Sequence, residues 1–180
     1  MFTIRDATKA FFSLDGTPPE QWTGLDKALR NLSQRIYMPS DGRKGRADTY
    51  SLQTICALRL VYKASVFGLD RWQLEKFSNF LQVAEPMNNA RKEAFAGGHR
   101  VLPPIEEAIQ RVSNAESFVF GISMLSDGTI KPFADWDTDE KEDLSLLEGP
   151  SFVRLPEDAR FTIPASRMIA ELFIEFEAAN

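Results

Sequence analysis

The sequence predicts an α+β fold, in which a mainly helical N-terminal domain precedes a small α+β C-terminal domain. Over residues 1–85, apolar side chains recur at the spacing of amphipathic helices. From residue 117 onward the chain has short runs of aromatic and branched residues, which favour strands. The charge balance changes as well. Residues 1–76 contain 12 Lys and Arg against 8 Asp and Glu, whereas residues 77–180 contain 9 against 18.

The composition argues against several classes of function. Hydrophobic residues make up 43% and charged residues 26% of the chain, as in ordinary globular proteins, and no apolar run is long enough to span a membrane. A single cysteine, Cys56, excludes an internal disulfide and predicts a cytoplasmic protein with an inert, buried thiol. With one histidine, His99, the chain cannot form a Cys/His zinc site. Since no phosphate-binding loop or nucleophile elbow is present, we expect no metal, no cofactor and no enzyme.

Two helices are predicted before residue 37. The first covers residues 2–12, with Thr3 as its predicted N-cap, and ends at the turn-forming residues 13–19. The second begins at Thr23 or Asp26 and continues to about residue 36. Its apolar stripe is expected to face the core and consists of Leu25, Leu29, Leu32 and Ile36.

A basic loop with two glycines, residues 39–46, separates these helices from two more. The third helix begins near Ser51 and ends before Gly68, which suits a left-handed C-terminal cap. Asp70 is the N-cap of a fourth helix that continues to about Val83. The aromatic residues of this fourth helix are expected in the core, namely Trp72, Phe77 and Phe80.

The remaining chain is predicted as a helical connector over residues 86–116 and an α+β domain over residues 117–180. Proline is favoured in the first turn of a helix, so Pro103-Pro104 predicts a helix in the connector. Two strands around the turn Asp127-Gly128 predict a hairpin. The other expected elements are an acidic, solvated loop over residues 135–148, short strands at 151–155 and 160–163, and a closing helix over 164–177.

Basic residues concentrate between Lys27 and Arg46, where only Asp41 opposes them. A helix fits the major groove of DNA, where Arg can pair with guanine and Asn or Gln with adenine. A neighbouring basic loop can reach the phosphates and fix the register. The same cluster also suits a merely solvated face. We predict that helix 26–36 and loop 40–47 bind double-stranded DNA through Lys27, Arg30, Asn31, Gln34, Arg35, Tyr37, Arg43, Lys44 and Arg46.

The order of helix, turn, polar-faced helix, basic glycine loop and apolar helix is that of a winged helix-turn-helix. Residues 29–39, residues 42–46 and Tyr50-Ser51-Leu52 resemble the recognition helix, wing and following helix of MerR-type regulators. That family has Ile-Arg-Tyr-Tyr-Glu, then Gly-Leu-Leu-Pro, then a glycine and arginines that lead into Tyr-Ser. The resemblance covers roughly residues 2–80 and implies a sequence-specific regulator of transcription.

The chain departs from the MerR pattern in several respects. Asn31 and Leu32 replace the tyrosine pair, and residues 15–23 expand the turn between the first two helices. The long helix through which typical members dimerise is not evident, and the metal-binding cysteines of the metal-sensing members are absent.

Two roles suit the acidic C-terminal domain: homodimerisation, because operators are commonly two-fold symmetric, or binding of a small-molecule or protein effector. Two alternative functions also fit the sequence. One is a protein-interaction adaptor or inhibitor that uses the acidic C-terminal domain. The other is a ligand-responsive sensor.

Overall fold

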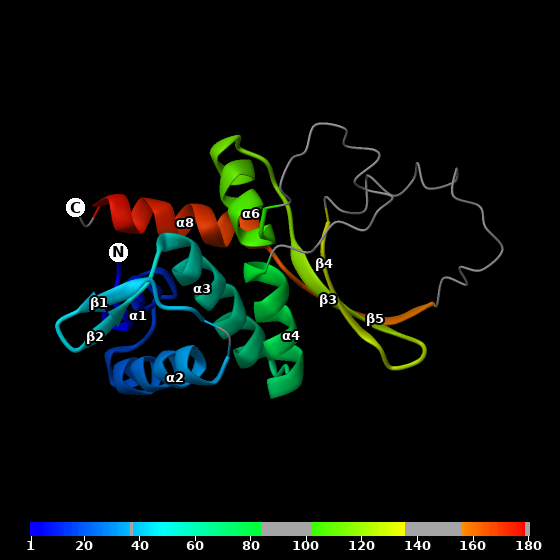
Figure 1. The fold of residues 1–180 in the computed structure, drawn as a ribbon, viewed down its shortest axis with the longest axis horizontal. Helices are drawn as coiled ribbons and strands as arrows, with labels where there is room; N and C mark the ends of the chain where they lie inside the picture. The colour runs from blue at the N-terminus through cyan, green and yellow to red at the C-terminus, as the bar shows by residue number, and fades with distance from the viewer. Residues whose placement is uncertain (37, 84–101, 136–155, 179–180) are drawn as a thin grey trace.

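The computed structural model describes residues 1–36, 38–83, 102–135 and 156–178 (Figure 1). These residues form six α-helices, one 3-10 turn and five strands in two antiparallel sheets. The predicted α+β class is therefore confirmed. None of the helices in the described ranges has the length and apolar character needed to cross a membrane.

The first two helices pack against each other at the N-terminal end of the fold. Helix α1 (Ile4–Leu14) begins at Thr3, whose side chain forms the predicted N-cap, and helix α2 spans Trp22–Arg35. The start predicted for α2, at Thr23 or Asp26, is wrong because the 3-10 turn Pro19–Gln21 leads directly into a helix that begins at Trp22.

The basic loop is a hairpin rather than an irregular connection. Strands β1 (Gly42–Lys44) and β2 (Ala47–Thr49) pair antiparallel. Gly45 in the turn has a φ of +65°, a left-handed conformation that glycine adopts without steric cost. The base of the hairpin is held by Phe2, whose backbone exchanges hydrogen bonds of 2.9 and 2.8 Å with that of Tyr50.

Helices α3 (Leu52–Phe67) and α4 (Arg71–Gln82) have the ends that the sequence predicts. Gly68 adopts the left-handed conformation after α3, and the Asp70 side chain caps the first turn of α4. Phe77 is buried and Phe80 is half-buried, as expected of core residues. The placement of Trp72 in the core is wrong. Its position on α4 faces solvent, and Trp72 is 50% exposed. Lys76 Nζ lies 4.2 Å from the centroid of its ring.

The C-terminal region contains two helices and a three-stranded sheet. Helix α6 (Pro104–Ser113) is followed by β3 (Phe120–Leu125) and β4 (Ile130–Ala134), which form the predicted hairpin around Gly128. Strand β5 (Glu157–Ile163) pairs with the other edge of β3, so the sheet order is β4-β3-β5. Helix α8 (Ala165–Ala178) closes the described chain.

Several predictions lie outside the described residues. They concern Tyr37, the connector up to residue 101, the strand at 151–155 and all but the first residue of the acidic loop. Strand β5 begins at Glu157, three residues before the predicted start of this strand, because its pairing with β3 continues to Leu125 after a register shift between Met124 and Leu125.

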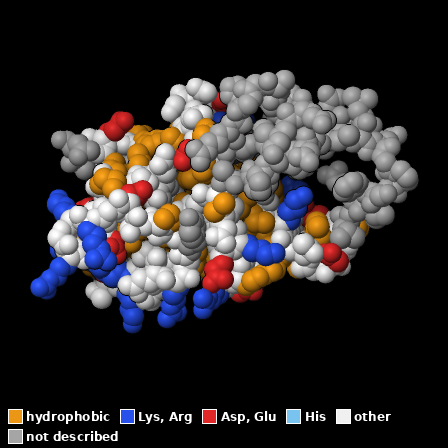
Figure 2. Space-filling model, in the orientation of Figure 1, with side chains coloured by type: hydrophobic (Ala, Val, Ile, Leu, Met, Phe, Trp, Pro, Cys, Tyr) orange, Lys and Arg blue, Asp and Glu red, His pale blue; other side chains and the backbone are white. Residues whose placement is uncertain are grey.

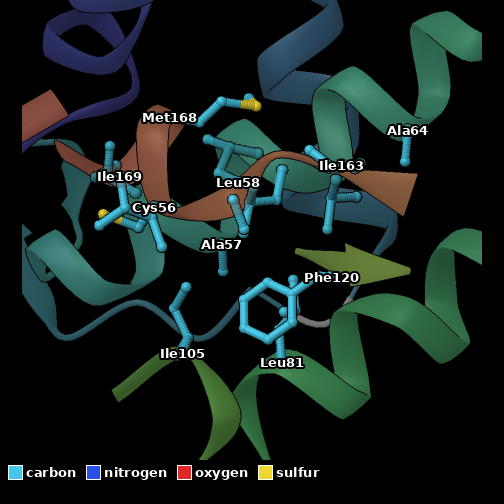
Figure 3. Packing of buried hydrophobic residues seen from close by; sticks show 14 of the residues in the cluster. Cys56, Ala57, Leu58, Ala64, Leu81, Ile105, Phe120, Ile163, Met168 and Ile169 are labelled. Atoms are coloured by element: carbon cyan, nitrogen blue, oxygen red, sulfur yellow. The ribbon is translucent and has the colours of Figure 1, made fainter. Parts of the chain in front are cut away.

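Helix α3 is the centre of the fold and is packed against α2, α4, α6 and α8. Figure 3 shows Cys56 and Leu58 of α3 among side chains such as Phe120 of β3 and Ile169 of α8. One hydrophobic cluster thus contains side chains from both predicted domains. Helix α8 also packs on α1, so the last helix supports the first.

Candidate nucleic-acid interface and charged cleft

Helix α2 and the β1–β2 hairpin, which are consecutive in the chain, expose most of the predicted DNA-binding side chains. Figure 2 shows Lys and Arg side chains gathered along the edge where Figure 1 places these two elements. We call this the basic surface. Its exposed predicted members are Lys27, Arg30, Gln34, Arg35, Arg43, Lys44 and Arg46.

Arg30 is held in place by an ion pair within α2. Its Nε donates to Asp26 Oδ2 at 2.7 Å and its Nη2 to Asp26 Oδ1 at 3.3 Å. The buried Thr8 hydroxyl of α1 lies 3.2 Å from the same Asp26 Oδ1. The hydrogen bond from Arg30 is the main cause that lowers the pKa of Asp26. The Arg30 guanidinium is therefore oriented before any ligand arrives, but part of its donor fork is already used.

The predicted residues of α2 do not all face the same way. Asn31 is half-buried and, together with Arg35, lines a groove of about 310 Å³ that also touches Ser65 and Arg71. Lys27 and Gln34 are exposed and lie two helical turns apart, on the outer face of α2. The structure thus brings Lys27 and Gln34 together on the outer face and turns Asn31 toward α3 and α4.

The hairpin carries its own positive charge. Arg43 faces Asp48 across the two strands, with Arg43 Nε 3.1 Å from Asp48 Oδ1. Lys44 and Arg46 flank the turn glycine, are exposed, and form no ion pair with another described residue. The tip of the hairpin therefore presents two cations that are available to an anion.

Two cations of α1 were not predicted as part of the interface. Arg5 and Lys9 are exposed and lie one helical turn apart. The charge of Arg5 adds to the hydrogen bond from Arg30 in lowering the pKa of Asp26, which places Arg5 near α2. Their spacing of four residues opposite the apolar stripe of the first helix was the signal that could have identified them.

A second charged site lies on another part of the molecule. It is a chain of five alternating charges that we call the Arg59 network. Lys63 Nζ lies 2.7 Å from Asp15 Oδ2, Arg59 Nη2 lies 3.3 Å from Asp15 Oδ1, and Arg59 Nη2 also lies 3.1 Å from Glu171 Oε2. Arg167 Nε completes the network at 3.5 Å from Glu171 Oε1. The network joins the end of α1, the middle of α3 and the first half of α8.

Arg59 is the buried centre of this network, with 2% of its surface exposed. Burial lowers the pKa of its guanidinium, and the charges of Asp15 and Glu171 oppose that shift. Only Nη2 donates to these carboxylates, and Nε and Nη1 are buried without a hydrogen-bond partner among the described residues. A single charge within the apolar run 55–61 was the available sequence signal, because a buried charge requires partners.

The Arg59 network borders an open cleft of about 690 Å³ between α3, β5 and α8. Four cations line this cleft, namely Arg59, Lys63, Arg160 and Arg167, against the two carboxylates of Asp15 and Glu171. Apolar side chains form another part of the wall. The rings of Phe67 and Phe161 lie there with their centroids 4.6 Å apart. The cleft therefore combines an excess of positive charge with an aromatic surface.

The described part of the chain contains neither a cluster of metal-binding side chains nor a reactive thiol. No group of three or more His, Cys, Asp or Glu side chains in that part is arranged to hold a metal ion. Burial raises the pKa of the Cys56 thiol to about 12, so the thiol stays protonated at neutral pH.

No family model matches the chain, and the comparisons with curated proteins and with solved structures gave no match either. The physical chemistry of the two charged sites is therefore the basis on which a function is assigned.

Proposed function

We propose that this chain is a sequence-specific, double-stranded-DNA-binding regulator of transcription with a winged helix-turn-helix similar to that of the MerR family. In this proposal α2 lies in the major groove and the β1–β2 hairpin lies on the phosphate backbone. The observation that supports it most is the basic surface. A helix and the hairpin that follows it present exposed cations together, and Lys44 and Arg46 at the hairpin tip form no ion pair with another residue that the structure describes.

The side chains of α2 have the chemistry that reads bases. Gln34 on the outer face can donate to and accept from adenine, and an Arg fork can donate to guanine. Asp26 orients Arg30, so less side-chain entropy is lost when Arg30 binds, although fewer of its donors are free. Arg35 lies at the edge of α2 toward α4 and is suited to a flanking phosphate.

The hairpin supplies affinity rather than specificity. Lys44 and Arg46 can each neutralise a phosphate and release its condensed counterion. Arg43 contributes a weaker contact because it also pairs with Asp48. Tyr37 belongs to the same proposed interface through its position in the sequence between α2 and the hairpin.

The acidic remainder of the chain is expected to face away from DNA, because residues 77–180 carry twice as many acidic as basic side chains. We include homodimerisation through the C-terminal region, since one module of this size covers little DNA surface. We also propose that the protein is cytoplasmic, is not an enzyme and uses no cofactor. The adaptor alternative depends on residues 135–148, of which only Asp135 is described.

Binding of the full chain to fluorescently labelled genomic fragments at low salt tests this proposal. We expect measurable affinity, and we expect the combined change of Arg30, Arg35, Arg43 and Arg46 to alanine to abolish it. A control variant removes three exposed cations elsewhere, namely Lys131, Arg160 and Arg167. If wild-type protein fails to bind, or if both variants lose affinity equally, the assignment of the basic surface is wrong.

A further inference from the structure

We propose that the cleft beside the Arg59 network binds a small organic anion, a carboxylate carried on an aromatic or aliphatic body. This site lies apart from the basic surface. It is formed by the end of α1 with α3, β5 and α8, whereas the basic surface is formed by α2 and the hairpin. The binding itself does not depend on the proposed DNA function.

The lining of the cleft carries an excess of positive charge. The Arg59 network alternates in sign and ends in a cation on both sides, with Lys63 at one end and Arg167 at the other. Arg160 adds a fourth cation to the lining and pairs with Glu157, which does not line the cleft. The lining therefore carries more positive than negative charge, and a carboxylate that enters is attracted to it.

The guanidinium of Arg59 does not use all of its hydrogen-bond donors within the described structure. Arg59 has five N–H donors, yet only its Nη2 reaches a carboxylate, and Nε and Nη1 lie buried without partners in the described structure. A buried donor without a partner destabilises the folded state. A guanidinium is suited to bind a carboxylate through two parallel hydrogen bonds, and Arg59 lines the cleft although its Nε and Nη1 are themselves buried.

An apolar wall adjoins the charged part of the cleft. Phe67 is 73% exposed although it is a large aromatic residue, and its ring leans on Phe161 beside the charged part of the cleft. Val66, next to it, is also exposed and lines the same cleft. Ligand sites are typically apolar walls with a few convergent polar groups. The combination favours an anion with a hydrophobic body over inorganic phosphate.

Titration of the full chain with 1-naphthoate, with 1-naphthylmethanol as an uncharged comparison, tests the proposal. Isothermal calorimetry measures both dissociation constants. We expect naphthoate to bind about tenfold more tightly than the alcohol, because only the carboxylate uses the cations. We expect inorganic phosphate to compete weakly, since it lacks the apolar body.

Two substitutions test the charged part and the apolar part of the site separately, and both leave the buried Arg59 unchanged. Arg167→Gln is expected to weaken naphthoate binding about fivefold and to leave the alcohol unchanged. Phe67→Ser is expected to weaken both ligands. Arg71→Gln is the matched control. Its side chain is 75% exposed, against 73% for Arg167, and it likewise pairs with a glutamate four residues on, but it does not line the cleft.

Several results would overturn the proposal. They are no binding of naphthoate at millimolar concentration, equal affinity for naphthoate and the alcohol, an Arg71→Gln effect as large as that of Arg167→Gln, or phosphate competing as well as naphthoate. Because DNA is absent from these titrations, their failure is distinguishable from failure of the DNA-binding proposal.

Discussion

Arg59 Nη2 and Glu171 Oε2 lie 3.1 Å apart although their residues are separated by 112 positions in the chain. The pair links the middle of the central helix to the last helix, and the Arg59–Asp15 contact adds the end of the first helix to the same group. A charge at the centre of the fold is thus stabilised by carboxylates from both the N-terminal and C-terminal regions. This relationship ties the two predicted domains electrostatically, in addition to their shared hydrophobic cluster.

Replacing Arg59 by alanine is expected to destabilise the protein by about 3 kcal/mol, because it removes a buried ion-pair partner and leaves a cavity. Arg59→Met is expected to cost less, since methionine fills the space and removes the donors that have no partner. Urea unfolding measures both values. The exposed Arg71→Ala change is the control, with an expected effect below about 0.5 kcal/mol. An Arg59→Ala loss no larger than this control would contradict the account.

Two glycines are expected to respond oppositely to alanine. A Cβ on Gly121 of β3 would lie 2.5 Å from Phe133 Cζ and 2.5 Å from the Phe161 carbonyl oxygen, so Gly121→Ala should cost about 1–3 kcal/mol. Gly24 in α2 has no atom within 4 Å of such a Cβ. Gly24→Ala should therefore stabilise the protein by up to about 1 kcal/mol through helix propensity. Thermal unfolding of both variants checks the signs, and a shift in the same direction would be incompatible with this packing.

The ion pair of Asp26 with Arg30 predicts an acid-dependent part of the stability. The hydrogen bond from Arg30 is the main cause that holds the folded pKa of Asp26 below its ordinary value of 3.8. The folded state thus favours the ionised carboxylate. The contribution of the Asp26 carboxylate to the free energy of unfolding is present above the unfolded pKa and is lost as the pH falls through the folded pKa.

Asp26→Asn removes this contribution. The free energy of unfolding of the variant should therefore fall less steeply than that of wild type as the pH is lowered through the acid range. Urea unfolding at a series of pH values measures it, with the exposed Glu20→Gln as a control for the loss of one negative charge. Parallel pH profiles for Asp26→Asn and wild type would exclude this role for Asp26.

Cys56 should be unreactive in the folded protein. It is completely buried on α3, and burial raises the pKa of its thiol to about 12, so neither access nor the thiolate form is available near pH 8. Ellman's reagent is expected to modify Cys56 only in denaturant. Rapid modification under native conditions would contradict the complete burial of Cys56 on α3.

The sequence predicts those parts of the fold that depend on a few neighbouring residues. The N-caps at Thr3 and Asp70, the C-cap at Gly68 and the hairpin turn at Gly128 all appear where local patterns indicate them. Each depends on a side chain and backbone groups within about four residues. Contacts between distant segments carry no such local pattern, so the pairing of β5 with β3 and the packing of α8 on α1 were not predicted.

The basic surface and the Arg59 network also differ in how far the sequence predicts them. The basic surface follows from the sequence because long charged side chains on a helix and a short loop are exposed almost regardless of the remaining fold. The Arg59 network depends on Asp15 and Glu171 reaching one guanidinium from distant segments. The sequence predicts less well which residues of α2 are exposed. Asn31 is half-buried in the groove that it lines with Arg35, and this burial depends on where α4 packs.

The salt dependence of DNA binding tests the central claim most directly. The logarithm of the binding constant is measured against the logarithm of salt concentration for wild type and for the double variant Lys44→Gln, Arg46→Gln. If both side chains neutralise phosphates, the magnitude of the slope should fall by about 2 and the affinity should fall for all sequences alike. Lys131→Gln, an exposed cation on β4, should leave the slope unchanged. A double variant with the wild-type slope and affinity would contradict the proposed contact of the hairpin with the phosphate backbone.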